Sequence, residues 1–274
     1  MRGRSTAGLS LLAAIALALS GCSGGASTST SAGAGKPAAS PAQIVLAANS
    51  KMTAAKSAKM RAEYTVSAPG QAAVTMTAEG VLDATSGAAD LTVTLPGFGT
   101  VPVRIVDGVV YAKVPEAMAS LAPKPWLKLD GDTMGAAAGQ FGAQNPADQL
   151  DMLAGLTDVT EVGPETIDGV KTTHYRGKVD LAKAVKAATD PASRKSLESA
   201  SKAMATATMP ADVWIDEEGR PRKMTFTMTG KPQAGSKGNP TMAGTATFSD
   251  FGTPVTVTAP PAAEVADIKD LQGK

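Results

Sequence analysis

Cysteine, histidine and aromatic residues are all scarce in this chain. Cys22 is the one cysteine, His174 is the one histidine, and aromatic residues make up 4% of the 274 residues. A lone cysteine cannot form an intramolecular disulfide, so the stability must come from the packed core. A metal site built from several histidines is excluded as well.

An excess of charge of either sign is also absent. The chain has 26 basic and 25 acidic residues, and 24 basic residues remain when Arg2 and Arg4 are left out. A protein that binds nucleic acid or an anionic membrane surface through charge carries a basic excess. We therefore expect no nucleic-acid partner.

Residues 1–21 have the three-part layout of an export signal. Two arginines come first, an apolar run extends from Leu9 to Leu19, and the small residues Ser20 and Gly21 end the segment. The run has about 11 residues, whereas a helix that spans a bilayer needs about 20. The segment is therefore expected to be a signal peptide that is removed, and not a permanent membrane span.

Cys22 follows this segment directly. The sequence LSGC, Leu19–Cys22, resembles the bacterial lipobox, whose cysteine receives a diacylglyceryl group and becomes the first residue of the mature protein. A buried cysteine would need apolar neighbours, but Ser, Gly, Ala, Thr and Pro dominate residues 23–41. Such a composition is typical of a flexible tether. We expect lipid attachment at Cys22, a tether over residues 22–41, and one domain over residues 42–274.

The expected location follows from this reading of the N-terminus. A cysteine that carries two or three acyl chains anchors a protein far more firmly than a single chain does. We therefore expect a lipid-anchored protein on the extracytoplasmic face of the cell membrane.

The domain begins with a helical pattern and continues with a strand pattern. Val45, Ala48 and Met52 recur at helical spacing and predict a helix from Ala42 to about Lys59. Beyond it, segments of period two predict about eleven strands. Asp107–Gly108 and Asp168–Gly169 are strong signals for hairpin turns.

Further helices are expected at three sites where a capping residue or a proline starts a helix. These sites are Asn145–Pro146, Asp180 and Asp190–Pro191. Strands joined by hairpins form an antiparallel sheet, which usually buries one face. The pattern favours an α+β fold in which a long, strongly curved antiparallel sheet holds helices on its concave side.

Methionine stands out among the apolar residues of the strands. The chain has 12 methionines against 5 phenylalanines, and Met224, Phe226 and Met228 alternate with threonines along one strand. Methionine adapts to irregular apolar ligands, and an acyl-chain pocket needs a lining without unsatisfied polar groups. These side chains either line such a pocket or fill a packed core, and periodicity alone favours the core. Leu150 and Leu153 either close a pocket or pack a helix on the sheet.

Several segments resemble the LppX/LprAFG family of actinobacterial, mycobacterial-type lipoproteins. They are the lipobox, the tether, VVYAKVP, WLKLD, NPADQLDML, VTEVGPETIDGVKTTHYRGKVDLAKAV and MPADVWIDEEGRPRKMTFTM. The resemblance implies a half-barrel related in shape to the LolA and LolB carriers. It also implies helices over the open side and a large apolar cavity that holds the acyl chains of lipids or lipoglycans.

The resemblance further implies a lipid carrier that works between the cell membrane and the outer envelope. We expect it to be a monomer. An export pump or an envelope acceptor would be its protein partner, and its ligand would be an acylated lipid or lipoglycan. The residues expected to line the cavity are Met76, Leu91, Val93, Val103, Ile105, Leu150, Leu153, Val213, Ile215, Met224, Phe226 and Met228. The alternative is an envelope lipoprotein that transports nothing and acts as an interaction or sensory module with a filled core.

Catalysis is disfavoured by the same scarcity of reactive residues. Acylation of Cys22 removes the only thiol. The string Gly-x-Ser-x-Gly occurs only at residues 21–25, next to Cys22, where no strand leads into a helix to form a nucleophile elbow, and no Gly-rich phosphate loop is present. We expect no enzyme and no cofactor. His174 is expected on the surface or half-buried in a strand, and the carboxylates of Asp216–Glu218 are expected in a solvated turn. Trp126 and Trp214 fit a sheet core better than a cavity rim.

Overall fold

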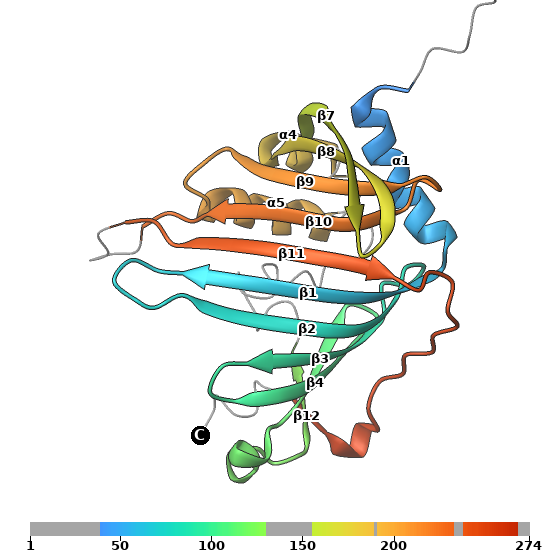
Figure 1. Cartoon of the computed structure of the whole chain (residues 1–274). Coiled ribbons are helices and arrows are strands. Elements are labelled where there is room, and N and C mark those ends of the chain that lie inside the picture. The colour runs from blue at the N-terminus through green and yellow to red at the C-terminus, as the bar shows by residue number, and fades with distance from the viewer. Residues whose placement is uncertain (1–38, 130–154, 189–190, 233–237, 268–274) are drawn as a thin grey trace, which may run out of the picture. The chain divides into compact units, whose positions relative to one another are not determined.

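A 12-stranded sheet dominates the part of the chain that the structure, a computed structural model, describes (Figure 1). The described residues are 39–129, 155–188, 191–232 and 238–267, and they belong to one unit, Ala39–Lys274. The strands are β1 Ser57–Ser67, β2 Val74–Asp83, β3 Ala89–Leu95, β4 Gly99–Val106, β5 Val109–Lys113, β6 Trp126–Leu129, β7 Leu156–Ile167, β8 Val170–Asp180, β9 Thr208–Asp216, β10 Pro221–Thr229, β11 Thr241–Ser249 and β12 Val265–Asp267.

Neighbouring strands in the sheet are mostly neighbours in the sequence. The order is β12-β6-β5-β4-β3-β2-β1-β11-β10-β9-β8-β7. All pairs are antiparallel except β12 with β6. The prediction of an α+β fold with an antiparallel sheet is confirmed, while the expected strand number was one too low. The strand missed was β12, because its three residues are too few to show a period.

Two hairpin turns lie where the sequence predicts them. Asp107 and Gly108 join β4 to β5 with φ values of 52° and 73°, and Asp168 and Gly169 join β7 to β8 with φ values of 47° and 79°. A two-residue turn with positive φ at both positions matches the right-handed twist of the flanking strands. Asp–Gly sequences adopt this conformation at low cost.

Helix α1, Pro41–Ala54, is shorter than the sequence pattern predicts. Its N-terminus has a capping box, in which Ser40 Oγ accepts the backbone N–H of Gln43 while Gln43 Oε1 accepts the N–H of Ser40. The predicted end at Lys59 was wrong. Lys56 has a φ of 69° and Ser57 already begins β1, because pairing with β2 and β11 outweighs helix propensity there.

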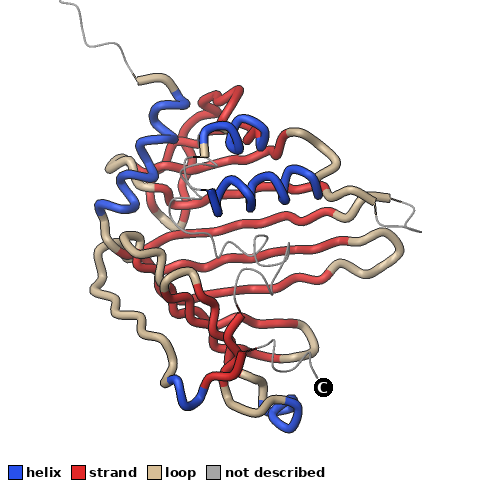
Figure 2. The backbone as a smooth tube through the Cα atoms, turned by 180° about the vertical axis from the view of Figure 1, so that it is seen from behind, coloured by secondary structure: helices blue, strands red, loops and turns tan. Residues whose placement is uncertain are grey.

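Helices α4, Leu181–Ala187, and α5, Pro191–Ala203, pack together against β8 and β9 (Figures 1 and 2). Asp180 caps α4 as predicted, since its Oδ1 accepts the N–H of Lys183 at 3.1 Å. Their shared core consists of Val179, Leu181, Ala184, Ala188, Leu197, Met204 and Met209. Two 3-10 helices, Glu116–Leu121 and Ala262–Glu264, lie near β6 and β12 in the sequence. The helix predicted after Asn145 lies outside the described residues.

Helix α1 packs beside the α4–α5 pair. Val45 and Ala48 contact Tyr175, Val213 and Ile215 of β8 and β9. Nearer its C-terminus, Met52 packs with Ala58, Phe248 and other residues. The described helices thus cover the sheet mainly from β7 to β10, and Figure 2 shows them over this part.

Candidate functional site

The inner face of the sheet, defined as the face against which α4 and α5 pack, is apolar over most of its width. Residues paired directly across antiparallel strands point to the same side. One such row contains Tyr175, Val213, Met224, Ala246, Ala62, Ala78, Val93 and Val101. A second row contains Phe248, Met60, Gly80, Leu91, Val103, Ala112 and Leu127.

The structure places the predicted lining residues that it describes on this one face. They are Met76, Leu91, Val93, Val103, Ile105, Val213, Ile215, Met224, Phe226 and Met228. Their burial differs, since Leu91, Val213 and Ile215 are buried while the side chain of Met224 is 38% exposed. Leu150 and Leu153 lie outside the described residues.

Small residues occupy the middle of the inner face, a feature that the sequence analysis missed. We call this group the small-residue strip, and it contains Ala62 of β1, Ala78 of β2, and Gly244 and Ala246 of β11. Larger side chains flank it, with Met224 and Phe226 on β10 and Val93 on β3. The sequence signal for this strip was Ala or Gly at alternate positions of a strand, as at Gly244 and Ala246 of β11. The side chains of the strip are short, and Ala62 and Ala78 are buried.

One aromatic ring lies directly over the strip. A Cβ atom on Gly244 would overlap the ring of Phe226, so only glycine lets this ring lie against the strand. The ring of Tyr64 is 6.3 Å from that of Phe226, at an interplanar angle of 50°. Burial raises the pKa of the Tyr64 phenol above its ordinary value.

The opposite face, which we call the outer face, is polar. Thr75, Thr92, Thr225, Thr245 and Thr247 lie on it, because each is one residue removed from an inner-face position. An antiparallel sheet with one apolar and one polar face normally buries the apolar one.

His174 lies on the outer face within a cluster of charges. Its Nδ1 is 2.8 Å from Glu165 Oε1, and its Nε2 is 2.6 Å from Asp212 Oδ1. Trp214 stacks on the imidazole at 4.2 Å and donates from Nε1 to Glu165 Oε2 at 2.7 Å. This hydrogen bond, with that of His174, holds the pKa of Glu165 below its ordinary value.

The prediction that His174 lies on the surface or half-buried was wrong, since it is 4% exposed. Stacking on Trp214 and pairing with two carboxylates make this burial possible on a polar face. Both ring nitrogens of His174 face carboxylate oxygens, so the imidazole is held between Glu165 and Asp212. This arrangement fits a structural role.

Trp214 and Trp126 are each 7% exposed. Both lie on the outer face, where Lys223 and Arg104 respectively cover their rings at 4.6 Å and 5.2 Å. They are therefore buried in the sheet, beneath cations, and do not belong to the inner face.

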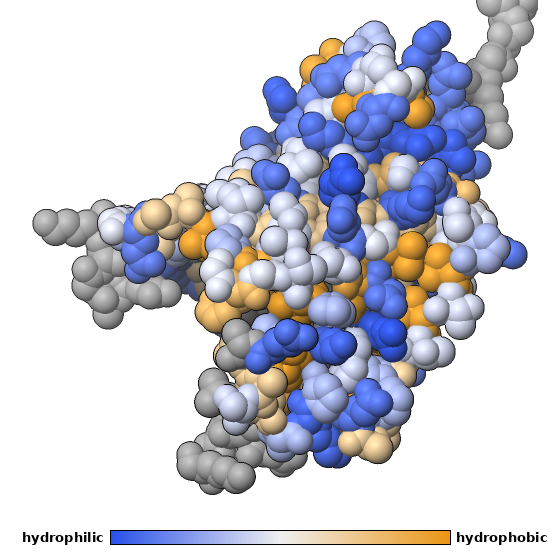
Figure 3. Space-filling view, turned by 60° about the horizontal axis from the view of Figure 1, so that its bottom comes forward, coloured by the Kyte–Doolittle hydropathy of each residue, from blue (hydrophilic) through white to orange (hydrophobic). Residues whose placement is uncertain are grey.

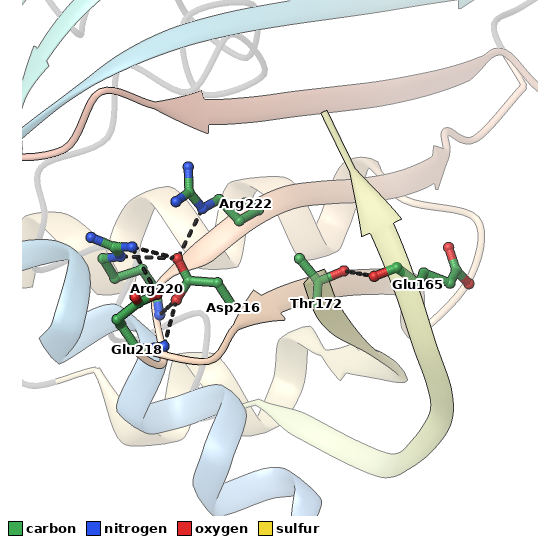
Figure 4. Close-up of polar contacts among 6 residues, drawn as sticks. All are labelled: Glu165, Thr172, Asp216, Glu218, Arg220 and Arg222. Atoms are coloured by element: carbon green, nitrogen blue, oxygen red, sulfur yellow. Dashed lines mark hydrogen bonds and ion pairs between the residues drawn. The ribbon is translucent and has the colours of Figure 1, made fainter. Parts of the chain in front are cut away.

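Asp216 is the centre of a second charged cluster, at the turn between β9 and β10 (Figure 4). Its carboxylate accepts the backbone N–H of Glu218 and of Arg220, and it accepts Nε of Arg220 and of Arg222 at 2.9 and 2.8 Å. Its side chain is fully buried, so the prediction of a solvated role was wrong for this residue. Glu218 is exposed, as predicted, and pairs with Arg220.

The charge state of Asp216 follows from competing effects. Burial alone would raise the pKa of its carboxyl group, but the Arg220 N–H and the two guanidinium groups outweigh burial and lower it. Both guanidinium groups also lie over the ring of Phe251, at 4.8 and 4.9 Å. The cluster therefore holds the β9–β10 turn against the segment after β11.

Replacement of Asp216 should destabilise the fold. Asp216→Asn leaves two arginines without their carboxylate, which we expect to lower the free energy of unfolding by about 3 kcal/mol. Because the pKa is lower in the folded state, the stability that Asp216 contributes is present above about pH 4 and is lost as the pH falls through the folded value. Urea unfolding at several pH values measures both effects.

Asp90→Asn, which breaks a half-exposed pair with Arg104, serves as control and should lower the free energy of unfolding by less than about 1 kcal/mol. Equal losses in the two variants would contradict this account.

A pocket of about 440 Å³ lies beside the outer-face clusters. Its lining includes Glu165, Lys171, Thr172, Asp216 and Glu217. Figure 4 shows the Thr172 hydroxyl donating to the backbone carbonyl of Glu165 at this place, at 2.9 Å. Ile215 of the inner face also lines this pocket, but the charged side chains in the lining do not suit an acyl chain.

Comparison with known proteins identifies the family. The profile of the LppX_LprAFG lipoprotein family matches residues 40–257. The chain belongs to this family. The resemblance seen in the sequence is therefore confirmed.

The individual relatives share less than a third of their residues with this chain. A 31.2 kDa protein of Streptomyces griseus is 29% identical over 187 residues, which cover 64% of this chain and 59% of that protein. The lipoprotein LppX of Mycobacterium tuberculosis has 21% sequence identity and a TM-score of 0.47, and the match covers 78% of this chain and 98% of LppX. LprF of Mycobacterium bovis has 15% identity and a TM-score of 0.45, with 80% and 96% covered.

None of the described helices is both long and apolar enough to cross a membrane. No group of three or more histidine, aspartate, glutamate or cysteine side chains in the described ranges could hold a metal ion.

Proposed function

We propose that this lipoprotein binds the acyl chains of a lipid or lipoglycan on the inner face of its sheet and carries them through the cell envelope. The observation that carries the proposal is the small-residue strip, flanked by methionine and branched aliphatic side chains. Family membership supports a lipoprotein role, and the register supports a common apolar face for the lining residues.

The physical task of such a protein is to shield an acyl chain from water. Exposure costs about 0.8 kcal/mol per methylene, which amounts to more than about 10 kcal/mol for a chain of sixteen carbons. The inner face offers apolar contacts in return, and methionines such as Met224 and Met228 can adjust to chains of different shape. The threonine-rich outer face stays in water.

The finer architecture is part of the proposal. We envisage the sheet as a curved half-barrel whose inner face becomes an enclosed cavity, with Leu150 and Leu153 closing it. Residues 1–21 would be the signal peptide, residues 22–41 the acylated cysteine and tether, and residues 42–274 the lipid-binding domain. The protein would act as a monomer, without catalysis, and an export pump or an envelope acceptor would be its partner.

A binding titration tests the proposal. The chain from residue 23 onward, which lacks the lipid-attachment cysteine, is mixed with a fluorescent fatty acid below its micellar concentration. We expect saturable binding that an unlabelled long-chain fatty acid displaces and that a short-chain acid of the same charge does not. Binding that is absent, or that the short-chain acid displaces equally well, would favour the alternative of an envelope module with a filled core.

A further inference from the structure

Two turns at one end of the sheet carry no charge. At the opposite end, the right-hand side of Figure 1, the connections carry Asp107, Asp168, Glu218 and Asp250, of which Glu218 and Asp250 pair with Arg220 and Lys59. At the other end, residues 68–73 between β1 and β2 and residues 96–98 between β3 and β4 carry no charge at all. We call these two turns, with the first residue of β2, the neutral rim.

The neutral rim exposes large apolar side chains. Phe98 is 59% exposed, the highest value among the exposed large apolar residues of the described chain, and Val74 is 47% exposed. Gly97 and Gly99 flank Phe98 with φ values of 83° and 75°, and no atom lies within 4 Å of a Cβ placed on either. The space beside both glycines is therefore open, and the phenylalanine between them is mostly exposed. In Figure 3, residues coloured as hydrophobic reach the surface in the part of the molecule that projects to the left of the view.

The rim continues into the apolar inner face. Val74 pairs with Val66, which in turn pairs with Met242, and all three point to the inner side. Leu95, the last residue of β3, is also on that side and leads directly into the turn of Phe98. An apolar path thus runs from the tips of two hairpins to the small-residue strip.

A cation lies close to this end. Lys231 follows β10, and farther along the same loop a Cβ on Gly238 would lie 3.1 Å from the Pro69 ring of the β1–β2 turn. The described parts of the β10–β11 loop contain no carboxylate. Neutral turns with apolar tips and a nearby lysine place no carboxylate against the surface of an anionic bilayer.

We propose that the neutral rim docks on the lipid bilayer, with Phe98 inserted at the boundary between headgroups and acyl chains, so that a ligand passes from the bilayer onto the inner face. This inference rests on the proposed function. A single inserted side chain gives weak, reversible docking, which suits a carrier that must leave again.

Vesicle flotation tests the docking. The chain from residue 23 is mixed with vesicles of phosphatidylcholine and phosphatidylglycerol, and the protein that floats with them is measured. Phe98→Ser should lower the vesicle-bound fraction, and the rate of acyl-chain uptake from the vesicles, about tenfold. Phe98→Leu should restore most of both, because it returns an apolar side chain. Val162→Ser, which changes a 51% exposed residue of β7, is the matched control and should behave as the parent protein.

The outcomes separate docking from ligand binding. Uptake of free fatty acid from solution should be the same in Phe98→Ser and in the parent protein, since Phe98 stands outside the inner face. If the parent protein does not float with protein-free vesicles, or if Phe98→Ser floats equally well, the docking proposal is wrong and a protein partner becomes the occupant of the rim. If no fatty acid binds from solution while flotation still depends on Phe98, the proposed function fails and the docking stands.

Discussion

Cys22→Ala should release the protein from the membrane completely. The variant is placed behind a signal peptide that the general signal peptidase removes, so that an uncut signal cannot hold it. An acyl chain contributes about 0.8 kcal/mol per buried methylene, and two or three chains together give stable anchoring. Their loss leaves only the weak docking of the neutral rim, which washing reverses. Cell fractionation measures the membrane-bound share, and the mass of the mature N-terminus shows whether the thiol carries a diacylglyceryl group.

Ser23→Ala behind the native signal is the matched control, since it changes the adjacent residue and keeps the thiol. It should remain in the membrane fraction with an acylated N-terminus. If the Cys22→Ala protein stays in the membrane fraction after washing, Cys22 is not the anchor.

Ala246→Phe should impair lipid binding more than any other single change on the inner face. Ala246 is half-buried in the small-residue strip, between Met224 and Ala62 in its row. A phenyl ring there takes the space of several methylenes, and two displaced methylenes at about 0.8 kcal/mol each already lower the affinity more than about tenfold. The fluorescent fatty-acid titration measures the change, at a temperature well below the melting transition of the variant.

Ala243→Phe provides the control for this prediction. Ala243 lies on the same strand but on the outer face, and it is exposed. The same substitution there should leave the affinity within about twofold, because a lone apolar residue on the surface disturbs little. If both variants bind with the affinity of the parent protein, the ligand does not occupy the strip.

Much of the fold could be predicted because local signals and tertiary structure agree in it. The Asp107–Gly108 turn forces positive φ at two successive residues, and strict alternation along β10 separates Met224 from Thr225. Where the signals conflicted, tertiary structure prevailed. Residues near Lys56 follow a helical pattern, but strand pairing on both sides of β1 begins at Ser57.

The His174 cluster could not be predicted, because its partners come from distant parts of the sequence. His174 is buried by Glu165 across one hairpin and by Asp212 on the strand that follows two helices. Asp216 lies in an acidic run that is typical of a solvated turn, and only the path of β10 brings Arg222 onto it. The small-residue strip was missed for another reason. An alanine in one strand indicates a strip of small residues only when the residues paired with it on the neighbouring strands are known.

The most direct test of the account is the mass of the protein as the cell makes it. The Cys22→Ala protein is purified without detergent from the growth medium or from the space outside the cell membrane. Its mass is measured by native mass spectrometry before and after organic extraction. We predict a population heavier than the polypeptide by the mass of an acylated lipid, which extraction removes and which Ala246→Phe largely lacks. A protein that has only the polypeptide mass, and that acquires no lipid on incubation with vesicles, would contradict the claim that the inner face binds acyl chains.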